Sequence, residues 1–225
     1  MKSMSWIGLG LLSACLGCGL GQLEEKIASG TMVEPEDWIG KPTSEWPQIV
    51  LTNLGEFKEH TSMRGASAFL VKGRNDIVLA ATAQHLIGKH GGVEPELSVD
   101  QFNHQLTSWI MYPRTLPDQK VRATRLGTSV QAVRHTDWLF MNIEEQEHYP
   151  AYPLERGAGP VRIGDKVFLV GCPYSEEDCR QNVYRGVVTE RTDDGMIRYD
   201  IEPPVNISGF SGAPILNDRG HVVAV

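Results

Sequence analysis

The sequence contains no long run of Lys or Arg, and its charge balance is mildly acidic. Its 225 residues include 21 Lys and Arg against 28 Asp and Glu, which gives a formal net charge of −7 at pH 7. A nucleic-acid-binding chain usually carries a concentrated basic patch. We therefore expect no nucleic-acid partner, and we interpret the excess of acidic residues as a source of solubility.

Cysteine is scarce, and no metal-binding pattern accompanies it. The four cysteines form two local pairs, Cys15 with Cys18 and Cys172 with Cys179, without the repeated CxxC spacing of a structural zinc site. The seven histidines include no HExxH pattern. We expect neither a metal nor a cofactor. Cys172 and Cys179 either close a small disulfide loop, in an oxidising compartment, or remain two free thiols.

The apolar stretch near the N-terminus is too short to span a bilayer as a helix. It covers residues 6–12 and follows a single charge at Lys2, which is typical of a secretory signal. Residues 1–18 are thus predicted to be a signal segment. The polar, irregular residues 19–45 are predicted to be a tether.

Residues 12–15 (LSAC) resemble a bacterial lipobox, in which the cysteine becomes the lipidated first residue of the mature protein. Two alternatives remain open, namely lipidation at Cys18 and an ordinary signal with an incidental cysteine. The resemblance implies export to the periplasm or cell envelope, with a lipid on Cys15 or Cys18 that anchors the protein to a bacterial membrane.

From residue 46 onward, short apolar runs alternate with clusters of Gly, Pro, Asp and Asn. Runs of this length bounded by turn residues are typical of β-strands. Many short strands and few helices favour an all-β barrel or sandwich. A polar, Pro- and Gly-rich stretch at residues 142–160 would divide the domain, residues 46–225, into halves at about 46–145 and 160–225.

A serine lies in a glycine-rich turn near the end of the chain, at residues 206–214 (NISGFSGAP). A serine hydroxyl is a weak nucleophile that needs a base and backbone N–H donors for the developing oxyanion. The glycine two positions before Ser211 lets the N–H groups of Gly209 and Ser211 point into one hole. By itself, the pattern fits a simple turn between two strands equally well.

Two upstream segments supply a base and its partner. Residues 80–86 (AATAQHL) contain His85 after an apolar run, and residues 135–140 (HTDWLF) contain Asp137 before another. They resemble the T-A-x-H and D-x-A-L segments of the chymotrypsin-like serine peptidases. The order His85, Asp137, Ser211 is also that family's order.

The resemblance, which is to the bacterial branch of this family, implies two antiparallel six-stranded β-barrels of the chymotrypsin type. It implies a serine endopeptidase that acts on a protein or peptide substrate through an acyl-enzyme. Ser211 would attack the scissile carbonyl and His85 would transfer the proton. Asp137 would orient His85, and the N–H groups of Gly209 and Ser211 would hold the oxyanion.

Two residues and the end of the chain depart from the family's pattern. Digestive members have an aspartate at the position of Phe210, which pairs with a new N-terminus after zymogen cleavage, so we expect that switch to be absent. Val205, at the expected floor of the specificity pocket, argues against a preference for Arg or Lys. Because the chain ends at Val225, we expect the second barrel to be incomplete. The alternative function is a catalytically inactive trypsin-like module that binds peptides or protein partners at the cell envelope.

Overall fold

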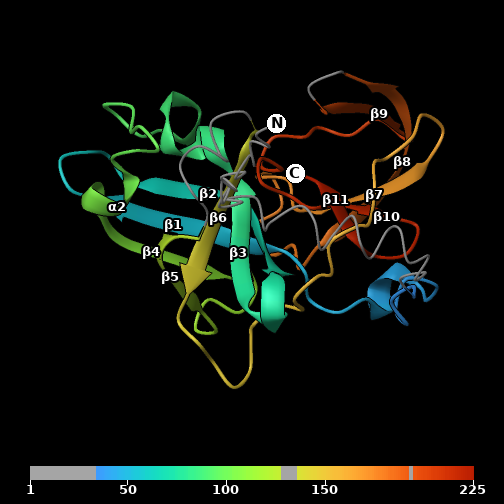
Figure 1. Ribbon diagram of the computed structural model, residues 1–225, viewed down its shortest axis with the longest axis horizontal. Coiled ribbons are helices and arrows are strands. Elements are labelled where there is room, and N and C mark those ends of the chain that lie inside the picture. Colours follow the sequence, from blue (N-terminus) through green and yellow to red (C-terminus); the bar gives the residue numbers. More distant parts are fainter. Residues whose placement is uncertain (1–33, 128–135, 193–194) are drawn as a thin grey trace, which may run out of the picture. The chain divides into compact units, whose positions relative to one another are not determined.

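The computed structural model describes residues 34–127, 136–192 and 195–225, and Glu34–Val225 forms one compact unit (Figure 1). The predicted signal segment, with Cys15 and Cys18, lies outside the described residues. The chain is nearly all β, as the sequence predicted. Within the described part, the single α-helix is the short α2 (Phe102–Gln105), and the remaining helical turns are 3-10 turns.

Six strands close into a barrel in the order β1-β2-β3-β6-β5-β4, with each neighbouring pair antiparallel (Figure 1). Closure leaves no unpaired strand edge. The barrel core is apolar and centres on large side chains such as Trp109, Phe102 and Met111. The strands are β1 (Leu51–Phe57), β2 (Met63–Lys72), β3 (Val78–Ala83), β4 (Leu106–Tyr112), β5 (Val121–Leu126) and β6 (Trp138–Ile143).

The second half is a five-stranded antiparallel sheet in the order β11-β10-β7-β8-β9, and it is not closed. The expectation of an incomplete second barrel is therefore confirmed. Its inner face buries a smaller apolar cluster that includes Val167, Leu169 and Ile215. The strands are β7 (Lys166–Gly171), β8 (Asn182–Arg191), β9 (Ile197–Ile201), β10 (Ile215–Asn217) and β11 (Val222–Ala224).

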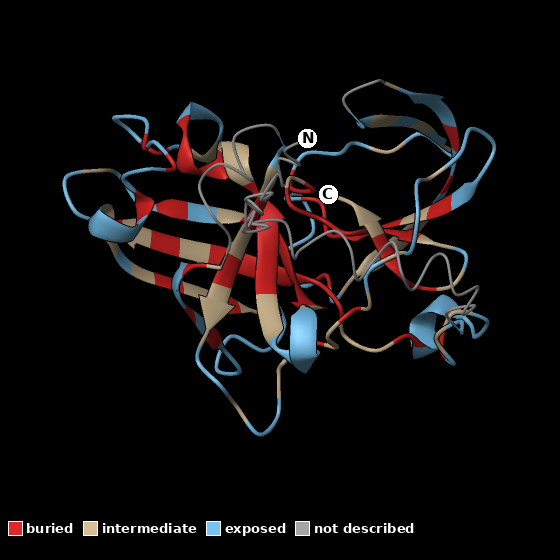
Figure 2. Cartoon of the chain, viewed as in Figure 1, coloured by how far each residue is buried: buried red, intermediate tan, exposed pale blue. Residues whose placement is uncertain are grey.

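A third apolar cluster joins the barrel to the second sheet. In β2, residues 66–71 (ASAFLV) are all buried, which explains why this strand is a continuous apolar run rather than an alternating one. Phe69 and Val71 belong to a cluster that also contains Val170 of β7 and Leu216 of β10. Figure 2 shows the resulting burial, with buried stretches along the strands and exposed connecting loops.

Residues 34–45 differ from the tether expected there, because they pack against the domain. Trp38 is 4% exposed and contacts Trp46 edge to face, with ring centroids 5.0 Å apart. The backbone N–H of Glu36 donates a hydrogen bond to the carbonyl of Arg219 at 2.8 Å. Burial of a large indole outweighs the Pro and Gly content that made the segment look irregular.

Candidate active site

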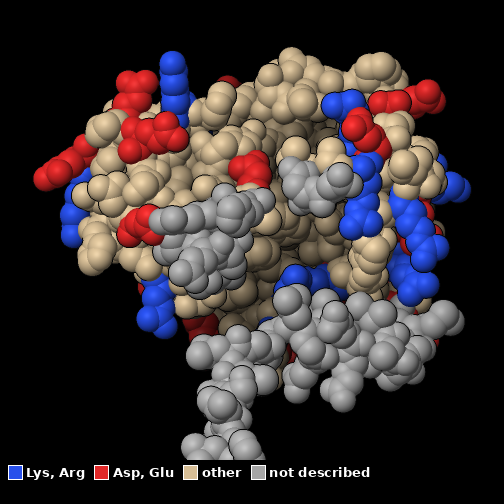
Figure 3. Space-filling view, turned by 45° about the horizontal axis from the view of Figure 1, so that its top comes forward, with Lys and Arg blue, Asp and Glu red and all other residues tan. Residues whose placement is uncertain are grey.

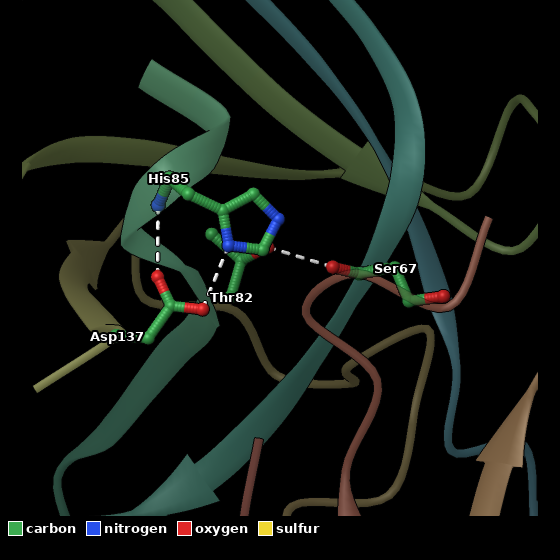
Figure 4. Close-up of polar contacts among 4 residues, drawn as sticks. All are labelled: Ser67, Thr82, His85 and Asp137. Carbon is green, nitrogen blue, oxygen red and sulfur yellow. Dashed lines mark hydrogen bonds and ion pairs between the residues drawn. The ribbon is translucent and has the colours of Figure 1, made fainter. Parts of the chain in front are cut away.

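His85 and Asp137 are brought together by the pairing of two barrel strands. In the β3–β6 ladder Ala83 lies opposite Trp138, so the residues just beyond these strand ends become neighbours. His85 lies in the 3-10 turn η3 (Gln84–Ile87) that follows β3. Asp137 Oδ2 lies 2.7 Å from His85 Nδ1, and Asp137 Oδ1 accepts the backbone N–H of His85 at 2.9 Å (Figure 4).

The carboxyl group of Asp137 is held in its ionised form. Burial alone would raise its pKa, but hydrogen bonds from the His85 ring and backbone outweigh that effect, so the pKa of Asp137 lies below its ordinary value. An ionised carboxylate can only accept hydrogen bonds, so Nδ1 of His85 must carry the proton. In the neutral ring, Nε2 then keeps its lone pair and can take a proton from another group.

The Ser211 turn packs against β2 and β3, the strands that lead to His85. The backbone N–H of Ser67 donates to the carbonyl of Ser211 at 2.8 Å, and the Ser67 hydroxyl donates to the carbonyl of Gly209 at 3.0 Å. Gly212 has a φ of +84°, and a Cβ there would lie 2.1 Å from the Ser67 carbonyl oxygen. This approach is possible only because Gly212 has no side chain. Among the described residues, no hydrogen bond joins the Ser211 hydroxyl to the His85 ring.

Backbone hydrogen bonds fix the orientation of the two peptide groups beside Ser211. The Ser208 carbonyl accepts from the N–H of Tyr174 at 3.0 Å, and the Phe210 carbonyl accepts from the N–H of Ala213 at 2.7 Å. In a trans peptide the N–H points opposite to the C=O. The N–H groups of Gly209 and Ser211 therefore point away from these partners. Neither has a hydrogen-bond acceptor within the described part of the chain, so both remain available for an oxyanion.

A buried polar network, which the sequence did not predict, connects the barrel core to this turn. The carbonyl oxygen of Ser67 accepts hydrogen bonds from Thr82 Oγ1 at 2.7 Å and from Asn53 Nδ2 at 3.0 Å (Figure 4 shows the Thr82 bond). Asn53 Oδ1 in turn accepts from the Trp109 indole N–H at 3.1 Å. Because Ser67 also bonds to the turn, the network holds the turn against the barrel. The one member of this network that the sequence pattern marks is Thr82, the threonine of the T-A-x-H segment.

Phe210 anchors the turn on its other side by apolar burial. Its ring packs over Gly171, where an added Cβ would lie 2.3 Å from Phe210 Cδ1. It also contacts the ring of Tyr184 edge to face, with centroids 5.5 Å apart. Phe210 therefore lies in an apolar pocket formed by Gly171 and Tyr184, and it makes no ion pair. Val205 lines an open depression together with residues 199–204 and Ile207, and this lining includes the acidic residues Asp200 and Glu202.

Cys172 and Cys179 form a disulfide whose loop lies beside the Ser211 turn. Among residues 34–127, 136–192 and 195–225, no cluster of three or more His, Cys, Asp or Glu is arranged to hold a metal ion. In the same ranges, no helix has the length and apolar character needed to cross a membrane.

Two comparisons with known proteins agree with the fold, namely a family model and the alignment to the structure of Deg5. A family model described as trypsin-like peptidase domain matches residues 66–225. The crystal structure of Deg5 aligns with a TM-score of 0.51 at 20% identity, covering 90% of this chain and 84% of Deg5. The serine endoprotease from Yersinia pestis aligns with a TM-score of 0.47 at 17% identity, covering 78% of this chain and 52% of that one. No curated protein matches the chain.

Proposed function

Because the chain belongs to the trypsin-like peptidase family, we propose that it is a serine endopeptidase whose catalytic residues are His85, Asp137 and Ser211. The observation that carries the proposal is the hydrogen-bonded His85–Asp137 pair beside a turn whose Gly209 and Ser211 N–H groups have no acceptor among the described residues. Ser211, which carries one of those N–H groups, is the nucleophile. A base, its orienting carboxylate and free N–H donors are the parts that acyl transfer requires.

The mechanism follows from these positions. Ser211 Oγ attacks the scissile carbonyl carbon while His85 Nε2 takes the hydroxyl proton, and the Gly209 and Ser211 N–H groups bind the resulting oxyanion. As the intermediate collapses, His85 returns the proton to the leaving amine and an acyl-enzyme remains. Water, deprotonated by His85, then releases the acid. Asp137 holds the His85 tautomer and stabilises the imidazolium in both halves of the cycle.

We propose that the substrate is a protein or peptide. The expected absence of a preference for Arg or Lys stays a prediction, because the depression that contains Val205 is lined by Asp200 and Glu202 as well as by Ile201, Pro203, Pro204 and Ile207. The described surface, seen from one side in Figure 3, carries charges of both signs.

A second candidate is a catalytically inactive trypsin-like module that binds peptides or protein partners. The observation that favours it is the missing hydrogen bond between the Ser211 hydroxyl and the His85 ring. We prefer the enzyme, since catalytic hydrogen bonds are often long in unliganded sites and tighten when substrate binds.

Labelling with a fluorophosphonate probe separates the two candidates. We expect the wild-type protein to be phosphonylated at Ser211, and Ser211→Ala to show no labelling while its circular dichroism and melting temperature stay unchanged. Ser62→Ala, the same substitution at an exposed serine outside the proposed machinery, is the matched control and should label at close to the wild-type rate. Absence of Ser211-dependent labelling in folded wild-type protein would refute the peptidase proposal and favour the binding module.

We also propose that the protein is exported to the periplasm or cell envelope and is anchored by a lipid on Cys15 or Cys18. The disulfide between Cys172 and Cys179 supports an oxidising compartment, where such bonds persist. Mass spectrometry of the mature N-terminus tests the anchor. We expect a lipid-modified cysteine, Cys15 or Cys18, as first residue, and an unmodified N-terminus at another residue would contradict the proposal.

A further inference from the structure

The loop between β7 and β8 lies directly against the oxyanion turn. It covers residues 172–181, and the disulfide joins Cys172 to Cys179, which are both buried, with exposures of 2% and 8%. A Cβ added to Gly209 would lie 2.9 Å from the carbonyl oxygen of Cys172 and 2.9 Å from the backbone N of Tyr174. The loop backbone therefore touches the residue that supplies one of the two free N–H groups.

One hydrogen bond from this loop decides where the N–H of Gly209 points. The N–H of Tyr174 donates to the carbonyl of Ser208 at 3.0 Å, and the Ser208 carbonyl has no other hydrogen-bond donor among the described residues. If that bond is lost, the peptide between Ser208 and Gly209 can rotate. Its carbonyl would then face the hole and its N–H would leave it. Gly209 offers little resistance to this rotation, because glycine adopts positive and negative φ angles about equally readily.

The next peptide along the chain is fixed independently of the loop. Its carbonyl, from Gly209, accepts the Ser67 hydroxyl, and its N–H, from Phe210, donates to the carbonyl of Ile207 at 3.0 Å. The barrel thus holds the Ser211 end of the turn. The Gly209 donor depends on the loop.

The loop itself is short of internal support. It has two long backbone bonds, from Glu176 to Pro173 and from Cys179 to Glu176, both at 3.3 Å. Tyr174, whose backbone makes the deciding bond, is 52% exposed and so is not fixed by burial. The disulfide and Arg114 hold the loop backbone, since the Arg114 guanidinium donates to the carbonyls of Pro173 at 2.8 Å and Glu176 at 2.7 Å. The side chain of Glu176 also accepts a hydrogen bond from Asn182 Nδ2 at 2.8 Å, which holds the side chain rather than the backbone.

We infer that the Cys172–Cys179 disulfide, together with Arg114, is a positioning element for catalysis, because it holds the Tyr174 N–H on the Ser208 carbonyl and thereby keeps the Gly209 N–H in the oxyanion hole. The inference rests on the proposed peptidase function. It assigns a role in the reaction to three residues that neither donate a proton nor contact the scissile bond. Removal of one oxyanion donor typically lowers the rate by about 10²–10³-fold.

The test measures fluorophosphonate labelling of the full chain at several probe concentrations, so that the maximal rate and the half-saturating concentration separate. For Cys172→Ala/Cys179→Ala we expect the maximal rate to fall at least about tenfold, with the half-saturating concentration within about twofold of wild type. For Arg114→Gln we expect a smaller fall of several-fold, and Arg114→Lys should restore part of it by donating to the same carbonyls. Arg198→Gln, which removes a surface arginine from an exposed ion pair with Glu190, is the matched control.

The outcomes separate positioning from simple stability. A folded double-cysteine variant with a lowered melting temperature but the wild-type maximal rate would overturn the inference, because a purely structural cross-link predicts that result. If the double variant does not fold, the maximal labelling rate of Arg114→Gln tests the inference instead. A maximal rate that falls in Arg114→Gln but not in Arg198→Gln supports the inference. Equal maximal rates in these two variants overturn it. A wild-type protein that is never labelled overturns the proposed function itself and the inference with it.

Discussion

Gly212 tests how closely the Ser211 turn packs against the barrel, and we predict that Gly212→Ala destabilises the domain strongly. At this position φ is +84°, and a Cβ would lie 2.1 Å from the Ser67 carbonyl oxygen, 2.3 Å from Thr82 Oγ1 and 3.0 Å from the backbone N of Ala83. Two of these atoms belong to the backbone of β2 and β3, which cannot yield as a flexible side chain would. The turn must therefore move away from the barrel.

Three effects determine the magnitude. A non-glycine residue in the left-handed region costs about 1–2 kcal/mol. Forcing a methyl group into a packed interior costs about 1–3 kcal/mol. Moving the turn also lengthens the hydrogen bond from the Ser67 N–H to the Ser211 carbonyl, a loss of about 1 kcal/mol. We expect a total near 4 kcal/mol, a large share of the roughly 5–15 kcal/mol by which a domain is stable.

Gly159→Ala is the matched control. Gly159 has nearly the same φ, +81°, but an added Cβ would have no neighbour within 4 Å. Gly159→Ala should therefore lower the free energy of unfolding only by the cost of a non-glycine residue in the left-handed region, about 1–2 kcal/mol. Urea unfolding followed by tryptophan fluorescence gives both values, and fluorophosphonate labelling of Gly212→Ala should fall as well, because Ser211 moves with the turn.

The comparison of the two alanine variants can refute the reasoning. If Gly212→Ala and Gly159→Ala lose the same free energy of unfolding, then Gly212 is not in close contact with β2 and β3, and the position assigned to the Ser211 turn is wrong. A large loss of stability with unchanged labelling would show that the turn can shift without affecting the nucleophile.

Three further predictions concern the same site. Asp137→Asn should lower the maximal labelling rate by about 10⁴-fold, because the amide favours the wrong tautomer of His85; a fall of less than tenfold would contradict an orienting role. Because the pKa of Asp137 is lowered in the folded state, its contribution to stability is present above the unfolded-state pKa and is lost as pH falls through the folded-state value. Wild type should thus lose stability relative to Asp137→Asn as pH is lowered from about 5 toward 3, and parallel pH curves in urea unfolding would disprove this. Thr82→Val should cost about 1–2 kcal/mol in urea unfolding, since it removes the donor to the Ser67 carbonyl and leaves an N–H of Asn53 without its acceptor; a neutral effect would show that the network is not needed.

The sequence predicted the two strands that position His85 and Asp137. An apolar run precedes His85 and another follows Asp137, and in the structure these runs are β3 and β6. The hydrogen bond between His85 and Asp137 then follows from one ladder, the β3–β6 pairing. Local patterns suffice where a functional residue directly adjoins a strand.

The polar network could not be predicted because it depends on strand register. Asn53 lies where the β1–β2 ladder shifts register between Thr52 and Asn53. That irregularity turns a polar residue into the barrel interior, toward Trp109 and the Ser67 carbonyl. No alternation in the sequence marks such a shift. The packing of Trp38 was missed for a related reason, since long-range contacts decide whether an irregular segment is bound or free.

The arrangement of the turn makes the site depend on both halves of the domain. The Ser211 turn makes few hydrogen bonds of its own. It is oriented by hydrogen bonds with Ser67 in the barrel and Tyr174 in the second half, and by the packing of Phe210 on Gly171. The disulfide loop orients the Gly209 N–H through the Ser208 carbonyl. The Ser211 N–H is oriented within the turn, by the bond from Ala213 to the Phe210 carbonyl, and the barrel holds this end of the turn through Ser67. The reactivity of Ser211 therefore depends on the packing of the two halves against each other. Residues that never contact the substrate affect it through this packing.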